Sequence, residues 1–163
     1  MSDDDEQIVC VDGSCLAQHD KKARRAGYSA YFGLHDPRNV SEPIEGEKHT
    51  NQVGEMMGVI AALERADPER PLLIISDSKY VIDGLVGSNG KPAWYINWQR
   101  NGWRTASRKP VENRTLWERM IAIAKKRKFR MRHQKAHAGH GGNETADRMA
   151  KMGARRVMNG QRK

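Results

Sequence analysis

Cysteine is scarce in this chain, with 2 residues in 163, and long hydrophobic runs are missing. Two cysteines cannot form the disulfide framework of a small secreted domain, and no stretch approaches the roughly 18 apolar residues of a membrane span. Four of the first six residues are acidic, whereas a secretory signal begins with basic and then apolar residues. We therefore expect an intracellular protein, cytoplasmic or nuclear, that has no membrane partner and consists of one domain.

Charge is abundant and unevenly distributed. The net charge is +9, but residues 1–99 carry 10 Lys and Arg against 16 Asp and Glu, whereas residues 100–163 carry 19 against 4. A basic half of this kind is typical of proteins that bind a polyanion such as nucleic acid. The alternative is a solubilising surface, and charge by itself does not decide between the two.

Hydrophobic periodicity predicts strands and helices in alternation. Period-two or continuous apolar patterns indicate strands, and repeats of 3.6 residues indicate helices. The predicted strands are 7–14, ending in a turn at Gly13, then 27–35, 41–48, 71–76 and 128–135, with an exposed loop over 15–26. The predicted helices are 51–66, 78–86, 94–100, 113–125 and 143–157. This order indicates a mixed sheet with helices packed against it.

Two aspartates follow apolar strands. Asp12 lies in Val-Cys-Val-Asp-Gly-Ser, and Asp77 follows Leu-Leu-Ile-Ile-Ser. Because strand ends of α/β sheets carry functional groups, the two carboxylates could lie close together. The alternatives are a turn-forming Asp before Gly13 and a helix-capping Asp before the helix that starts near Ser78.

Two further acids, Glu55 and Asp147, each lie one turn into a predicted helix, and each could instead be an ordinary solvated residue. Clustered carboxylates need a cation to remain ionised, and a set of oxygen ligands favours Mg²⁺ or Mn²⁺ over Zn²⁺. Four such residues could hold two ions about 4 Å apart, an arrangement that supports in-line phosphoryl displacement.

Several motifs occur together and in order along the chain. They are Val11-Asp12-Gly13-Ser14, Thr50-Asn51-Gln52 followed by Glu55, Ser76-Asp77-Ser78-Lys79-Tyr80, and Lys135-Ala136-His137-Ala138-Gly139-His140 followed by Asn143, Glu144 and Asp147. In combination they resemble the type 1 ribonuclease H catalytic domain over about residues 8–152. The resemblance implies an α/β ribonuclease H-like fold, a five-stranded mixed sheet flanked by helices on both faces.

The resemblance also implies an activity. Asp12, Glu55, Asp77 and Asp147 would hold two Mg²⁺ ions, for which Mn²⁺ could substitute, and His137 would act as the family's mobile histidine. The implied reaction hydrolyses the RNA strand of an RNA/DNA hybrid and leaves 5′-phosphate and 3′-hydroxyl ends. The alternatives are a different nuclease on the same fold and a catalytically weakened protein that binds hybrids or duplexes.

Substrate contacts follow from the same resemblance. Asn51 and Gln52 match the residues that read the minor groove, and Cys15, Gln18 and Lys79 match neighbouring contacts. Thr50 and Asn113 match a pocket for a DNA phosphate, although both could also cap helices. The stretch at about 91–110 resembles the family's basic handle, in which Trp94, Arg100 and Arg104 are the expected contacts, whereas Trp98, Trp103 and Trp117 are expected in the core.

The expected organisation is a disordered acidic tail over 1–7, a catalytic domain over 8–157 and a basic tail over 158–163. We expect a monomer without an obligate protein partner. Val53-Gly54 and Ala136 depart from the family pattern, and Gly54 lowers helix propensity by about 1 kcal/mol. Both cysteines are expected to be reduced, because a bond between Cys10 and Cys15 would strain the strand that carries Asp12.

Overall fold

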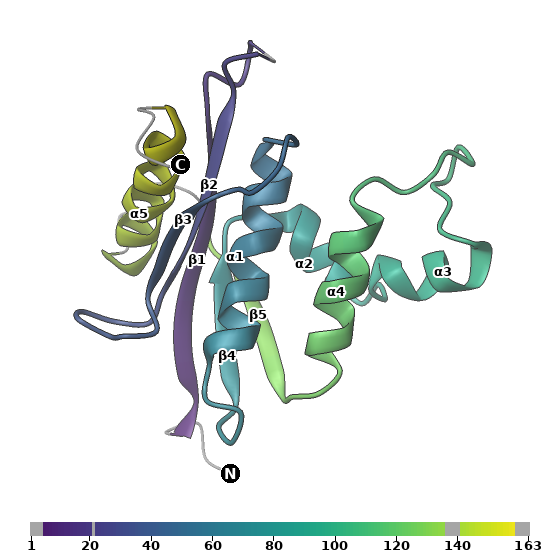
Figure 1. Cartoon of the computed structure of the whole chain (residues 1–163). Helices are drawn as coiled ribbons and strands as arrows, with labels where there is room; N and C mark the ends of the chain where they lie inside the picture. Colours follow the sequence, from purple (N-terminus) through teal and green to yellow (C-terminus); the bar gives the residue numbers. More distant parts are fainter. Residues whose placement is uncertain (1–4, 21, 136–140, 159–163) are drawn as a thin grey trace.

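The computed structural model describes residues 5–20, 22–135 and 141–158. Within these residues, five strands and five helices follow one another along the chain (Figure 1). The strands are β1 (Gln7–Leu16), β2 (Arg25–Tyr31), β3 (Val40–Pro43), β4 (Leu72–Ser76) and β5 (Phe129–His133). The helices are α1 (Asn51–Arg65), α2 (Lys79–Leu85), α3 (Trp94–Asn101), α4 (Arg114–Ala124) and α5 (Gly141–Met158).

The strands form one five-stranded sheet in the order β3-β2-β1-β4-β5. β1, β2 and β3 pair antiparallel, whereas β4 pairs parallel with both β1 and β5. The sheet is therefore mixed, and the predicted α/β class is confirmed. Because β1, β4 and β5 run in the same direction, their C-terminal ends meet at one edge of the sheet.

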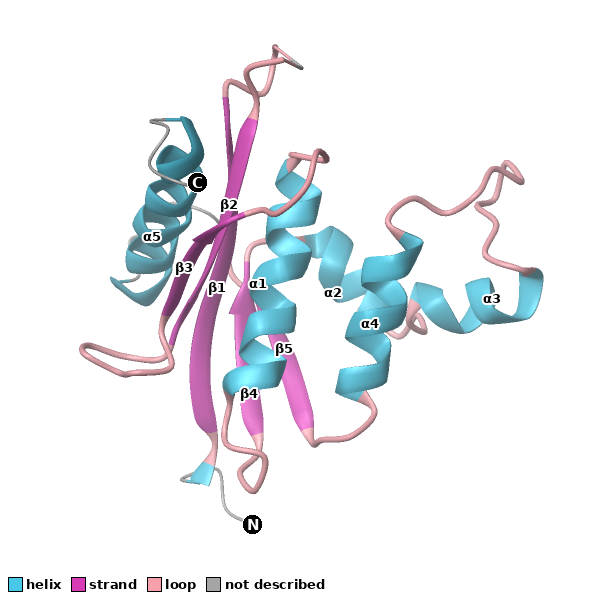
Figure 2. Cartoon of the chain, viewed as in Figure 1, coloured by secondary structure: helices cyan, strands magenta, loops and turns pink. Residues whose placement is uncertain are grey.

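Helices cover both faces of the sheet (Figure 2). α5 packs across β1, β2 and β3 on one face, and α1 packs against β1 and β2 on the other, with α4 beside it. The main core lies between the sheet and the α1–α4 layer. Its fully buried side chains include Val9, Met56, Val59, Ile60, Leu72, Ile74, Trp117 and Met120.

Glycines bring helices and sheet into direct backbone contact. A Cβ atom on Gly54 of α1 would lie 2.8 Å from the carbonyl oxygen of Gly27 and 3.1 Å from the Cα of Gly13. On the opposite face, a Cβ atom on Gly27 would collide with the backbone of α5 at Ala150 and Ala154. The low helix propensity of Gly54 thus has a structural reason, because a larger residue would push α1 away from the sheet.

Two buried or half-buried serines join α5 to the strands beneath it. The Ser29 hydroxyl of β2 donates to the Ala146 carbonyl at 2.6 Å, and the Ser41 hydroxyl of β3 donates to the Met149 carbonyl at 2.6 Å. Ser29 is fully buried. These bonds hold α5 at a defined position along its own axis.

The handle consists of α3 and the loop that follows it. α3 ends at Gly102, whose φ of 76° is left-handed, and a short bridge between Arg104 and Pro110 closes the loop. Trp98 packs against both Trp103 and Trp117, with ring centroids 5.7 and 5.2 Å apart. Trp117 and Trp103 are buried as predicted, and Trp98 is half-buried against the same core.

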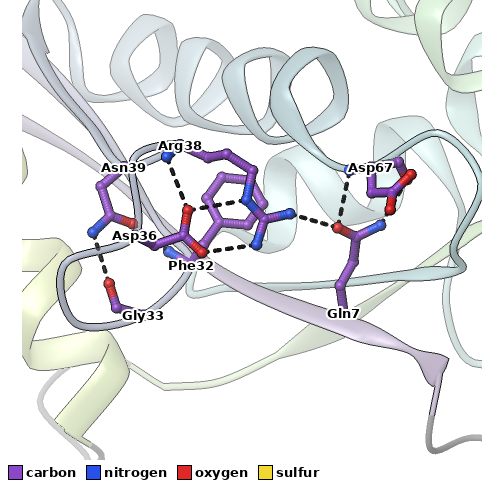
Figure 3. A network of polar contacts seen from close by, with 7 residues as sticks. All are labelled: Gln7, Phe32, Gly33, Asp36, Arg38, Asn39 and Asp67. Atoms are coloured by element: carbon purple, nitrogen blue, oxygen red, sulfur yellow. Dashed lines mark hydrogen bonds and ion pairs between the residues drawn. The ribbon is translucent and has the colours of Figure 1, made fainter.

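A polar network closes the sheet at the end where β1 begins (Figure 3). Arg38 donates to both carboxylate oxygens of Asp36, stacks 4.2 Å from the Phe32 ring centroid and donates to Gln7 Oε1 at 2.8 Å. Gln7 in turn accepts from the backbone N–H of Asp67 and donates to its carbonyl oxygen. The network connects β1, the β2–β3 loop and the end of α1.

Several predicted boundaries are wrong. β1 does not turn at Gly13 but continues to Leu16, and β2 already begins at Arg25, so the predicted loop over 15–26 shrinks. β2 ends at Tyr31 rather than at residue 35, and β3 ends at Pro43 rather than at residue 48. Gln7 belongs to β1 and is 4% exposed, so it is not part of a disordered tail.

Two other predictions about the chain can be compared with the structure. Cys10 and Cys15 are free thiols, as expected. No helix among the described residues is long and apolar enough to cross a membrane.

Candidate active site

The C-terminal edge of the parallel strands brings Asp12 and Asp77 together. Parallel pairing of β1 with β4 ends at Cys10 and Ile75, and each aspartate lies two residues beyond that pair. With Glu55 from α1, they form a group in which one carboxylate oxygen from each residue lies within 4.8 Å of the other two. The predicted proximity of the two aspartates is confirmed, and Glu55 joins them.

The alternative roles for the two aspartates do not hold. Asp12 lies inside a continuous strand, where its Oδ1 accepts from the Gly13 N–H at 2.9 Å, and no turn follows it. Ser78, rather than Asp77, caps α2, because its hydroxyl accepts from the Val81 N–H at 3.2 Å. The Asp77 carboxylate is therefore not used by the helix cap.

The position of Glu55 depends on the glycine contact between α1 and β1. A Cβ atom on Gly13 would collide with the backbone of Gly54 and Glu55, so only glycine at residue 13 lets the first turn of α1 come this close. Thr50 caps the helix by accepting from the Val53 N–H at 3.1 Å. The Oε2 atom of Glu55 is buried, so this residue is not an ordinary solvated glutamate.

Asp147 reaches the cluster from the opposite face of the sheet. It lines a hollow of about 290 Å³ together with Asp12 and Asp77. Its Oδ2 forms an ion pair with Lys151 Nζ at 2.9 Å, one turn further along α5. Ser29, the direct strand partner of Asp12, holds the helix at the carbonyl of Ala146, immediately before Asp147.

Crowding raises the pKa values of the carboxyl groups. Burial, then the charge of Asp77 and the contact with Asp147, raise the pKa of Asp12 to about 8. Burial, followed by the charges of Asp12 and Asp77, raises the pKa of Glu55 well above its usual range. Burial also raises the pKa of Asp77. Without a cation, the site therefore keeps protons that isolated carboxyl groups would lose at neutral pH.

These residues fit a divalent cation. The buried atoms Glu55 Oε2 and Asp77 Oδ1 have no hydrogen-bond partner among the described residues. An unpartnered buried carboxylate oxygen is costly, and a metal ion would satisfy it. The donors are all oxygens, which suits Mg²⁺ or Mn²⁺.

A second hollow lies beside the N-terminus of α1. Five of the predicted substrate-binding residues line it: Cys15, Gln18, Thr50, Asn51 and Gln52. His19 and Arg24 complete the lining. Asn51 Nδ2 donates to Gln18 Oε1 at 2.8 Å across this hollow. The structure thus brings together residues that are separated by more than 30 positions in the chain.

The remaining predicted contacts lie in three other places. Asn113 lines a cavity of about 540 Å³ between α1 and α4, its side chain donates to the Tyr80 hydroxyl at 3.4 Å, and it makes no side-chain cap bond to α4. Lys79 and Trp94, which is 40% exposed, line a hollow after α2. Arg104 lines a hollow of the handle loop, and Arg100 is exposed on α3.

His137 lies outside the described residues, as does Ala136. Other residues at the centre were not predicted. Lys151 could have been found from its i, i+4 spacing to Asp147, which places both on one helix face. Ser29 carries no such signal, because its partner is 117 residues away.

The fold and this carboxylate cluster define an α/β protein whose sheet edge carries a group of acids that could hold a metal ion. The RNase H family model matches residues 4–155, so the chain belongs to the RNase H family. Ribonuclease H of Jannaschia sp. is 41% identical over 159 residues, covering 95% of each chain. Ribonuclease H of Schizosaccharomyces pombe is 37% identical over 150 residues, 92% of this chain.

The present chain spans 53% of the length of the S. pombe relative. Among solved structures, a foamy viral protease-reverse transcriptase in complex with dsDNA superposes with a TM-score of 0.71 at 25% identity. That match covers 91% of this chain and 93% of the other. The predicted family and its fold are therefore confirmed.

Proposed function

We propose that this protein is a Mg²⁺-dependent endoribonuclease that hydrolyses the RNA strand of RNA/DNA hybrids and leaves 5′-phosphate and 3′-hydroxyl ends. One observation carries the proposal: one carboxylate oxygen each from Asp12, Glu55 and Asp77 lie within 4.8 Å of one another, beside a hollow that Asp147 also lines. Membership of the RNase H family supports the same activity.

The four carboxylates would hold two Mg²⁺ ions, or Mn²⁺ in their place. When bound, such a pair activates a water nucleophile and stabilises the leaving oxygen of an in-line displacement. The chain's own part is to hold the ligands. The strands fix Asp12 and Asp77, the Gly13–Gly54 contact fixes Glu55, and the Ser29 bond to α5 fixes Asp147.

Substrate recognition would extend to both sides of this centre. Asn51 and Gln52 are exposed at the start of α1, where they can meet the 2′-hydroxyl edge of a minor groove. Trp94 and the exposed arginines of the handle provide an aromatic face and cations for the DNA strand. We assign proton transfer or product release to His137.

The test is cleavage of labelled RNA/DNA, RNA/RNA and DNA/DNA duplexes in Mg²⁺, with Asp77→Asn as the inactive control. We expect cleavage of the hybrid's RNA strand alone, lost in the variant. Equal cleavage of all three duplexes would contradict the proposal. Tight hybrid binding without cleavage by the unmodified protein would favour the weakened binding protein instead.

The handle can be tested separately. Changing Arg100, Arg104 and Arg108 together to alanine should raise KM more than it lowers kcat, because these exposed cations lie away from the carboxylates. It should also flatten the salt dependence of binding, since each phosphate contact releases counterions. An unchanged salt slope would remove the handle from substrate binding.

We further propose that the protein acts inside the cell and as a monomer. Both follow from the proposed substrate and from a site whose assigned ligands all belong to one chain. Sedimentation at micromolar concentration, with and without hybrid, tests the monomer, and imaging of the tagged protein tests the compartment.

A further inference from the structure

His49 is a buried histidine that the proposed reaction does not use. It precedes the capping residue of α1 and is 8% exposed. Its Nδ1 lies 2.8 Å from the backbone nitrogen of Ala26 in β2, and its Nε2 lies 2.9 Å from the carbonyl oxygen of Gly46. Both ring nitrogens are therefore used by backbone groups.

These two bonds define the tautomer of the ring. The Ala26 N–H can only donate, so Nδ1 must be the unprotonated acceptor. Nε2 then carries the hydrogen and donates it to the Gly46 carbonyl. No apolar side chain of similar size could satisfy both the donor on β2 and the acceptor in the loop.

The backbone of His49 is tied to β1 as well. Its carbonyl oxygen accepts from the thiol of Cys15, with Sγ at 3.6 Å. The same segment has a second bond to β2 that does not involve His49, because the Ala26 carbonyl accepts from the Ile44 N–H at 2.9 Å. His49 is thus the point at which the segment leading into α1 is joined to both β1 and β2.

The residues directly after His49 are predicted substrate contacts. Thr50, Asn51 and Gln52 line the same hollow as Cys15 and Gln18. Asn51 and Gln52 are exposed, so neither is held by burial, although Asn51 donates to Gln18. Their backbone position depends on the helix cap at Thr50 and on the bonds of His49 just before it.

We infer that His49 is a positioning residue that holds Asn51 and Gln52 in place to read the hybrid. The inference rests on the proposed function and deepens it, because it assigns substrate affinity to a residue that need not touch substrate. Loss of the ring bonds would let the segment move relative to β2. Hybrid binding would then weaken, while the carboxylates, fixed by the strands and by the glycine contact, would stay in place.

The experiment measures equilibrium binding of a fluorescent RNA/DNA hybrid in EDTA, and kcat and KM in Mg²⁺. His49→Ala removes both ring bonds. His49→Asn keeps an acceptor where Nδ1 lies and loses the bond to Gly46. His35→Asn is the matched control, because His35 is exposed on the β2–β3 loop and its left-handed φ of 60° suits asparagine.

We expect His49→Ala to raise Kd and KM for the hybrid by about tenfold, which corresponds to the free energy of one lost hydrogen bond. The value of kcat should stay within twofold of normal. His49→Asn should recover part of the loss, and His35→Asn should change nothing. If His49→Ala does not fold, His49→Asn compared with His35→Asn decides alone, with an expected rise in KM without a fall in kcat.

Two failures remain distinguishable. If the unmodified protein binds no hybrid, the proposed function fails. If it binds hybrid and the folded His49 variants bind equally well, or lose kcat rather than affinity, the assignment of His49 fails and the proposed function stands.

Discussion

Charged side chains are paired at one end of the sheet and crowded together with like charges at the other. At the end where β1 begins, Asp36, Arg38 and Gln7 are joined to one another and to the backbone of Asp67 (Figure 3). Arg127 adds donors to the same turn, and its buried Nε is the one described atom there without a partner. At the other end, like charges crowd together, and buried oxygens of Glu55 and Asp77 have no partner.

This contrast separates stability from function within one sheet. The bonds at the paired end stabilise the folded state, and they leave few polar groups available to a ligand. Burial and repulsion between the carboxylates destabilise the folded state at the other end, and a bound cation can offset this destabilisation. Changes at the two ends should therefore have opposite signatures.

The largest expected effect is on activity at the carboxylate end. Asp77→Asn should lower the rate of RNA cleavage by more than about 100-fold. Loss of a residue that merely supports a metal ligand already lowers activity by up to about 100-fold, and Asp77 is a proposed ligand itself. The variant's metal-free melting temperature should stay equal or rise, because a buried charge is removed. Asp83→Asn, which changes an acid bonded to Ser88, is the matched control. Activity above half of normal in Asp77→Asn would contradict the comparison.

The converse holds at the paired end. Gln7→Ala removes bonds to Arg38, to Asp67 and to the Arg70 carbonyl, and it should lower the free energy of unfolding by about 2–3 kcal/mol. Activity per folded molecule should not change. Urea denaturation measures the loss, with Gln99→Ala on the exposed surface of α3 as the control. Equal unfolding free energies for the two variants would show that the network adds no stability.

The pH dependence of stability should also differ in sign. Asp12 keeps its proton up to about pH 8 in the folded state but loses it near pH 3.8 when unfolded. The metal-free protein should therefore lose on the order of 1 kcal/mol per pH unit as pH rises from 5 to about 8. Thermal melts of the metal-free protein at several pH values measure this slope, and Asp12→Asn should reduce it.

Asp36 should act in the opposite direction. Arg38 lowers its pKa to about 2, so its contribution is present above about pH 4 and is lost as pH falls toward 2. Asp36→Asn should thus reduce acid sensitivity and leave the slope above pH 5 unchanged. A slope above pH 5 that responds to Asp36→Asn but not to Asp12→Asn would reverse the comparison.

The smallest effect concerns the attachment of α5. Ser29→Ala removes the bond to the Ala146 carbonyl, next to Asp147, and should raise the Mg²⁺ dissociation constant by about threefold to tenfold. Calorimetric titration without substrate measures this directly. Ser41→Ala removes an equal bond further from Asp147 and should have less effect. A larger effect of Ser41→Ala would show that the serines stabilise the helix and do not position the ligand.

Local signals were sufficient for most elements. The Thr50 cap and the 3.6-residue pattern located α1, and the apolar run before Asp77 located β4. The main error, a turn at Gly13, arose because glycine usually marks a turn. Here the glycine instead serves a contact with α1, whose residues lie more than 40 positions away, and no local pattern reports such a contact.

The residues of the site also differ in whether a local sequence pattern marks them. Asp12, Glu55, Asp77 and Asp147 could be named because family motifs surround them, and three of them form the compact group. His49 and Ser29 could not be named, because their roles depend on partners in other elements: Ala26 for His49 and Ala146 for Ser29. Residues that position the proposed reacting groups through distant partners are therefore the hardest to predict from a sequence.

The aromatic cluster at the base of the handle has an optical consequence. All four tryptophans of the chain, Trp94, Trp98, Trp103 and Trp117, lie in it, with ring centroids 5.2 to 6.0 Å apart between neighbours. At these distances excitation energy should pass from one indole to the next, so we expect the four tryptophans to respond together. Intrinsic fluorescence therefore reports the junction between handle and core, and Trp94 opens that signal to quenching by a stacked nucleobase.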